Sequence, residues 1–205
     1  MIATDNDLQT KIPFALTNVY DFAGFTTLTA QMVAEGTTTG PVKSESRIDA
    51  TKLNIQRINR LIKTTKLLPE WDTLFGIENL EFLAITETWC GDGAQILPVV
   101  SRIADHIGVP LRIILRDEYP DIIDRYQFRN TRSIPVLIAF NRLTGEELGW
   151  WGPKPADAQK IVDDAKINNI PHDDYVISLQ NWYNQTKTIP LQQELLSFVQ
   201  RCLSK

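Results

Sequence analysis

The sequence has few of the residues that build metal sites and disulfide frameworks. Its 205 residues include two cysteines, Cys90 and Cys202, and two histidines, His106 and His172. The cysteines lie far apart, and neither a C-x-x-C pair nor an H-E-x-x-H motif occurs. We therefore expect no disulfide scaffold, no metal site and no bound cofactor.

Excess positive charge and long hydrophobic runs are also lacking. With 21 Lys and Arg against 25 Asp and Glu, the formal net charge is −4, so no general attraction to nucleic acid or to an anionic membrane is expected. The longest apolar runs, such as residues 134–140, fall far short of the roughly 20 residues of a membrane helix. Residues 1–7 are acidic where a secretory signal would be basic. We expect a cytoplasmic protein that binds neither nucleic acid nor membrane.

What the chain does contain is an ordinary globular composition, 43% hydrophobic and 22% charged. Hydrophobic periodicity and turn residues divide it into an N-terminal helical extension (1–76), a core (77–168) and a C-terminal helical extension (169–205) packed on the core. The core elements predicted are strands at 80–86, 111–115, 134–140 and 147–151, and helices at 94–106, 120–126 and 156–167. Their order predicts an α/β fold, a central mixed sheet of about four strands flanked by helices.

The two extensions read as helical. The helices predicted there cover residues 13–35, 46–68, 173–185 and 190–203, with a turn-forming joint at 36–41. The second of them is amphipathic, and its basic residues are predicted to lie on a solvated face: Lys52, Arg57, Arg60, Lys63 and Lys66.

The stretch W-C-G-D-G, residues 89–93, stands between the first predicted strand and its helix. This places Cys90 at or near a helix N-terminus, where unpaired amides and the helix dipole favour thiolate over thiol. A cysteine in a glycine-rich turn is less typical of core packing than one within an apolar stripe. We expect Cys90 to be reactive or to contact a ligand.

Here the sequence resembles the thioredoxin superfamily, whose W-C-G-P-C motif also opens a helix after a strand. The resemblance continues in Pro98, in the segment Arg132-Ser133-Ile134-Pro135, which is similar to the family's R-G-I-P with its cis proline, and in Gly152. It implies a thioredoxin-like fold over residues 77–168. The chain also resembles bacterial thioredoxin-like proteins that carry W-C-G-D-A/G at the site.

The departures from the family motif decide which chemistry remains. Gly93 replaces the second cysteine, so the dithiol cycle of thioredoxin is excluded. Asp92 replaces the motif proline and raises the thiol pKa, in opposition to the helix terminus, and the sequence leaves the balance open. Ala84 stands where thioredoxins bury a proton-transferring acid.

The resemblance therefore implies a monothiol site with Cys90 as the attacking group. The substrate-binding residues predicted around it are Trp89, Gly91, Asp92, Gly93, Arg132, Ile134 and Pro135. Trp150 and Trp151 are further candidates for the rim, with core packing an equal alternative. Cys202 falls on the apolar stripe of the last helix, so we expect it to pack rather than to pair with Cys90. His106 is expected to cap or pack.

Two functions of different kinds stay open, together with a weaker third. The first is a monothiol thiol-disulfide oxidoreductase that acts on mixed disulfides between proteins and a small thiol. The second is a non-catalytic binding or redox-sensing module that uses the same groove. A thiol peroxidase is only superficially supported by the T-W-C context of Cys90. The oligomeric state cannot be read from the sequence.

Overall fold

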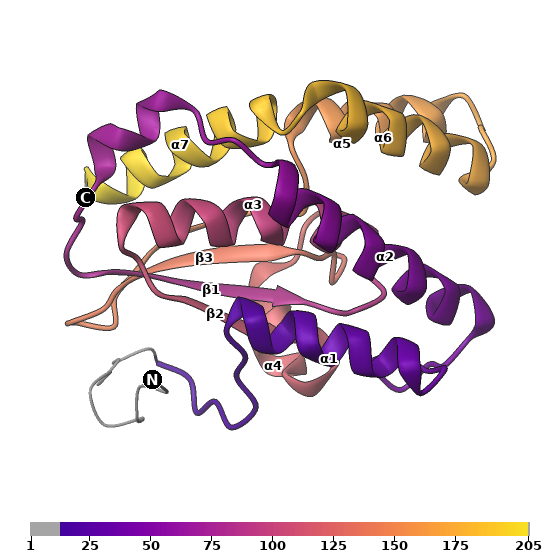
Figure 1. The fold of residues 1–205 in the computed structure, drawn as a ribbon, viewed down its shortest axis with the longest axis horizontal. Coiled ribbons are helices and arrows are strands. Elements are labelled where there is room, and N and C mark those ends of the chain that lie inside the picture. Colours follow the sequence, from indigo (N-terminus) through magenta and orange to yellow (C-terminus); the bar gives the residue numbers. More distant parts are fainter. Residues whose placement is uncertain (1–12, 205) are drawn as a thin grey trace.

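A computed structural model describes residues 13–204, which are arranged around one mixed sheet (Figure 1). The strands are β1 (Leu80–Thr86), β2 (Leu111–Leu115), β3 (Val136–Asn141) and β4 (Glu147–Trp151). Their order across the sheet is β2-β1-β3-β4, with β1 and β2 parallel and the other pairs antiparallel. The prediction of an α/β architecture with a four-stranded mixed sheet is confirmed.

Helices surround this sheet. They are α1 (Phe22–Ala34), α2 (Glu45–Thr64), α3 (Gly91–Ile107), α4 (Pro120–Ile123), α5 (Ala156–Ile167), α6 (His172–Thr186) and α7 (Ile189–Leu203). Short 3₁₀ turns occupy Pro69–Leu74, Arg116–Glu118 and Asp124–Tyr126. In this described part of the chain, no helix has the length and apolar character needed to cross a membrane.

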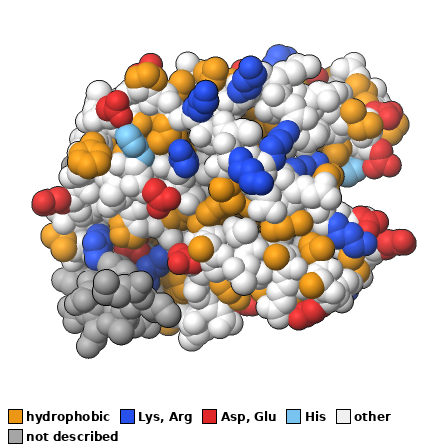
Figure 2. All heavy atoms as spheres, in the orientation of Figure 1, with side chains coloured by type: hydrophobic (Ala, Val, Ile, Leu, Met, Phe, Trp, Pro, Cys, Tyr) orange, Lys and Arg blue, Asp and Glu red, His pale blue; other side chains and the backbone are white. Residues whose placement is uncertain are grey.

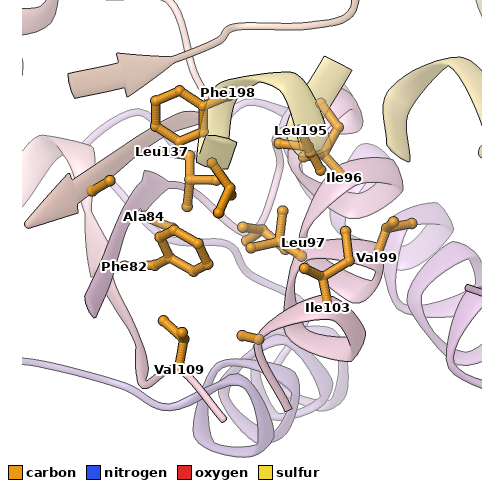
Figure 3. Close-up of a cluster of buried hydrophobic side chains, with 14 of the residues drawn as sticks. Phe82, Ala84, Ile96, Leu97, Val99, Ile103, Val109, Leu137, Leu195 and Phe198 are labelled. Atoms are coloured by element: carbon orange, nitrogen blue, oxygen red, sulfur yellow. The ribbon is translucent and has the colours of Figure 1, made fainter. Parts of the chain in front are cut away.

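The larger hydrophobic core lies on the sheet face covered by α3 and α7 (Figure 3). Phe82, Ala84 and Leu137 of the sheet meet Leu97 of α3 and Phe198 of α7 in this core. The opposite face carries a smaller core, where Ile122, Ile123 and Tyr126 cover side chains of β1 and β3. Both faces of β1 are therefore buried, which explains its apolar run Phe82–Ile85.

The first helix is shorter than predicted. Residues 13–35 were expected to be helical, but α1 begins at Phe22 because the preceding residues make other contacts. Tyr20 pairs with Ile113 of β2 through two backbone hydrogen bonds of 2.9 and 2.7 Å. Asp21 then caps α1 by accepting a 2.6 Å hydrogen bond from the Gly24 amide.

The C-terminal helices take two different positions. α7 packs on β4 and completes the large core, whereas α6 packs beside α5 (Figure 1). α6 is also tied to the helices that flank the sheet: Gln95 of α3 donates a 3.0 Å hydrogen bond to Gln180, and Arg60 of α2 donates one of 2.5 Å to Asn184. These bonds hold α6 near the start of α3.

Candidate functional site

Cys90 is the N-cap residue of α3. Its sulfur accepts a 3.2 Å hydrogen bond from the amide of Gly93, which places the thiol at the positive end of the helix dipole. The helix begins at Gly91, three residues earlier than predicted, because the cysteine rather than a later residue supplies the cap.

A buried polar network fixes the turn before Cys90. Glu87 accepts hydrogen bonds from the Thr39 hydroxyl and, at 2.9 Å, from the amide of Asp117. Asn54 of α2 donates a 2.9 Å hydrogen bond to the carbonyl of Thr88. Burial raises the pKa of Glu87. Since these partners come from three separate segments, the position of the turn depends on the whole fold.

The Cys90 thiol is buried, and its pKa is raised. Cys90 is only 6% exposed, and its thiol donates a hydrogen bond to the carbonyl of Ile134 over 3.4 Å. Burial, and then the negative charge of Asp92, raise the pKa of Cys90 to about 12. From the sequence, the helix terminus was expected to lower the thiol pKa and Asp92 to raise it. The largest effect on this pKa is instead desolvation, which only the packed structure reveals.

The carboxylate of Asp92 is held from two directions. Tyr183 of α6 donates a 2.8 Å hydrogen bond to Oδ1, and Lys154 lies 3.1 Å from Oδ2. Burial and the neighbouring Asp92 raise the pKa of Tyr183 well above its ordinary value. Neither Tyr183 nor Lys154 was singled out in the sequence, and no motif marks them, because their role depends on where α6 and the loop after β4 lie.

The Ile134–Pro135 peptide bond is cis and lies beside the thiol through the Ile134 carbonyl. Gly152 approaches the same segment closely. Its φ is 141°, and a Cβ at this position would overlap the carbonyl oxygen of Pro135. A side chain at position 152 would therefore push the Pro135 segment away from its present place.

A cavity of about 850 Å³ opens beside this turn. Six of the eight site residues predicted from the sequence line it: Trp89, Cys90, Gly91, Asp92, Arg132 and Ile134. The other two, Gly93 and Pro135, are buried and do not contribute to its lining. Arg132 is exposed and pairs with Asp124, with nitrogen–oxygen distances of 2.7 and 2.6 Å.

The remaining candidates lie elsewhere. The Trp150 ring packs against Tyr126, and the Trp151 indole donates a 3.2 Å hydrogen bond to Glu194, so neither lines the cavity. Cys202 is buried in the large core and forms no disulfide with Cys90. His106 lies 2.8 Å from Asp72 and packs edge-on against Phe75, which agrees with a packing role.

One expectation for α2 is wrong. Its basic residues were predicted to face solvent, but Arg57 is partly buried and lines the cavity. Its Nη1 would lie 3.4 Å from a Cβ at Gly91, so the guanidinium rests against the start of α3. Arg57 was misplaced because α6 covers part of the α2 surface, a packing that helical periodicity does not show.

A family model described as Thioredoxin matches residues 40–166. The chain belongs to the thioredoxin family. This match confirms the thioredoxin-like fold that the W-C-G and I-P landmarks indicated. It begins within the segment predicted as the N-terminal extension, so α2 is included in it.

Solved structures similar to this thioredoxin-family chain share little of its sequence. The crystal structure of an HIV epitope-scaffold aligns with a TM-score of 0.51 and 15% identity over 88% of this chain and 98% of that one. A protein of unknown function from Pseudomonas aeruginosa aligns with a TM-score of 0.46 and 15% identity over 80% and 96% of the two chains. No curated protein matches the sequence.

Proposed function

We propose that this thioredoxin-family protein is a non-catalytic binding module, in which the cavity beside Cys90 receives a ligand and the thiol stays protonated. The observation that carries this proposal is the burial of Cys90 behind Asp92 and Ile134, with only 6% of the residue exposed. With a thiol pKa of about 12, Cys90 is protonated at pH 7. A protonated thiol is a poor nucleophile for disulfide exchange.

The contacts of α6 also support a binding module with a protonated thiol. Tyr183 is itself buried, and it binds the carboxylate that stands next to the cysteine. An incoming disulfide must reach the sulfur of Cys90 in line with its own S–S bond, and the low exposure of Cys90 restricts that approach.

The test is the alkylation of Cys90 by iodoacetamide between pH 6 and 10, followed by peptide mass spectrometry. We expect Cys90 in the native protein to react at least about a hundredfold more slowly at pH 7 than in unfolded protein, and with no apparent pKa below the free-thiol value of about 8.5. The Cys202 peptide serves as an internal control for a core cysteine. Rapid alkylation with an apparent pKa below that value would overturn the proposal.

The second candidate is monothiol exchange, which the bond from the Gly93 amide to the Cys90 sulfur favours. In an arrangement with α6 displaced, the Cys90 thiolate would attack a protein–small-thiol mixed disulfide. The sulfur of the small thiol would join Cys90, and the protein sulfur would leave as a thiolate. A second small thiol would then attack this mixed disulfide, which releases the Cys90 thiolate and a disulfide of the two small thiols. Turnover of a glutathionylated peptide in the presence of excess glutathione, lost in Cys90→Ser, would select this candidate over the binding module.

A further inference from the structure

The cavity beside Cys90 is of a size that takes small molecules. Its volume of about 850 Å³ falls in the range of roughly 300–1,000 Å³ that is common for ligand pockets. Its walls come from α2, from the turn that begins α3, from residues 131–134 before β3, and from α5 and α6. Of these walls, only α6 lies outside the residues that the family model matches.

Charge on this lining is strongly asymmetric. Asp92 is the one carboxylate among the lining residues, against six cations: Arg47, Arg57, Arg116, Arg132, Lys154 and Lys166. The chain as a whole has a net charge of −4, so an excess of Lys and Arg in the composition does not explain the cations on this lining. Figure 2 shows Lys and Arg side chains gathered on the face that carries α2. A cavity with such a lining attracts anions.

Three of these cations already have a carboxylate partner. Arg116 pairs with Asp117 at 2.7 Å, Arg132 with Asp124, and Lys154 with Asp92. In the part of the chain that the structure describes, the other three have no carboxylate within ion-pair distance: Arg47, Arg57 and Lys166. These are the charges left for a ligand.

Arg47 and Arg57 lie beside the turn that carries Cys90. The guanidinium of Arg47 lies over the Trp89 ring, 4.1 Å from its centre, and its Nη1 is buried without a hydrogen-bond partner. Arg57 donates a 2.9 Å hydrogen bond to Asn54 and lies against Gly91 at the start of α3. Both arginines line the cavity, and a hydrogen bond from a guanidinium to an acidic ligand group is stronger than one between neutral groups.

Apolar side chains also line the cavity. They come from three helices: Ala50 and Leu53 of α2, Val162 of α5, and Tyr175, Val176 and Leu179 of α6. Leu53 is 46% exposed, so part of this apolar surface is in contact with water. Apolar surface of this kind gains free energy when a hydrocarbon chain or ring covers it.

We propose that the cavity binds an amphipathic organic anion, with a carboxylate or phosphate head at Arg47 and Arg57 and an apolar body between α2 and α6. This inference deepens the binding function proposed above and rests on it. A free inorganic anion would leave the apolar side chains in contact with water, and a neutral hydrocarbon would leave the two arginines without a charged partner.

Decanoate, below its micelle concentration, is the probe, and isothermal calorimetry on the full chain is the measurement. We expect saturable 1:1 binding of decanoate, and none of acetate or decyltrimethylammonium at the same concentration. Arg57→Gln and Arg47→Gln should each weaken the dissociation constant about tenfold or more, since a charged hydrogen bond is lost. Decyl phosphate in place of decanoate distinguishes the two head groups.

Matched variants control for general surface effects. Lys63→Gln removes a charge from the exposed side of α2, and Ile177→Ser removes an apolar side chain from α6 that is 61% exposed. Both should bind decanoate as the natural sequence does, whereas Val176→Ser should bind it more weakly. Circular dichroism shows whether each variant is folded. Equal affinity in Arg57→Gln, Arg47→Gln and Lys63→Gln would overturn the proposal.

Two further outcomes would also overturn it: binding to phosphatidylglycerol vesicles without binding of monomeric decanoate, and binding of an acidic peptide alone. The outcome of the decanoate experiment is independent of the outcome of the Cys90 alkylation experiment. Rapid Cys90 alkylation together with specific decanoate binding would reject the neutral-thiol module and keep the ligand class. An unreactive Cys90 without decanoate binding would keep the neutral-thiol module and reject the ligand class.

Discussion

The hydroxyl of Tyr183 donates a 2.8 Å hydrogen bond to Asp92, which stands two residues after Cys90. Through this bond the C-terminal extension contacts the motif at the start of α3. Because Asp92 also pairs with Lys154, its carboxylate has a tyrosine and an ammonium as partners beside a buried thiol. The properties of Cys90 therefore depend on a helix that lies outside the family match.

Tyr183→Phe should loosen this contact. We expect the free energy of unfolding to fall by about 2 kcal/mol, because a buried hydrogen bond to a charged group is lost. Alkylation of Cys90 should become faster. Chemical denaturation and alkylation kinetics measure the two effects. Ser178→Ala, which removes an exposed hydroxyl that bonds only within the same helix, is the control and should change both quantities little; unchanged alkylation in Tyr183→Phe would show that α6 does not restrict the thiol.

Asp92→Asn should lower the pKa of Cys90. The carboxylate is the second cause of its elevation, after burial, so its removal should reduce the thiol pKa by on the order of 1 unit. Since burial remains, the value should stay above that of a free thiol. The pH dependence of Cys90 alkylation gives both numbers, and an identical profile in the two proteins would contradict the prediction.

Stability should decline at alkaline pH because of Cys90. Its pKa is about 12 in the folded protein, against an ordinary value of 9.0. Below pH 9 the thiol is protonated in both states, and its contribution to stability is fully present. As the pH rises from 9 towards 12, the unfolded chain ionises first and the folded state loses about 1 kcal/mol per pH unit.

The comparison protein for this prediction is Cys90→Ala, which lacks the thiol but keeps the buried tyrosines that also ionise at high pH. Urea denaturation at pH 8, 9 and 10 should show a steeper loss of unfolding free energy in the natural sequence than in Cys90→Ala. Parallel slopes would mean that the folded and unfolded thiols ionise together.

Gly93 cannot be replaced freely by the second cysteine of the family motif. A Cβ at this position would collide with the Thr86 hydroxyl and lie 3.4 Å from the Cys90 sulfur. Gly93→Ala should therefore cost about 1–3 kcal/mol of stability through overpacking. Combining it with Thr86→Ala should cost less than the sum of the two single changes, as measured in a double-mutant cycle; additive costs would exclude the collision.

Much of the fold could be predicted because local patterns specify it. The strands β1, β2 and β4 and the helix α5 have the predicted bounds, since apolar runs and turn residues mark each of them. The apolar stripe of α7 correctly placed Cys202 in the core. The start of α1 could not be predicted, because it depends on the pairing of Tyr20 with Ile113.

For the site, the sequence by itself determined its centre: Cys90 at the head of a helix, Asp92 beside it and no second cysteine in the motif. The tertiary structure alone decided that this thiol is buried, that Tyr183 and Lys154 hold Asp92, and that Arg57 faces a cavity instead of water. The reason is physical. Helix and strand formation follow the spacing of nearby side chains, whereas desolvation and ion pairing depend on groups that packing brings together from distant parts of the chain.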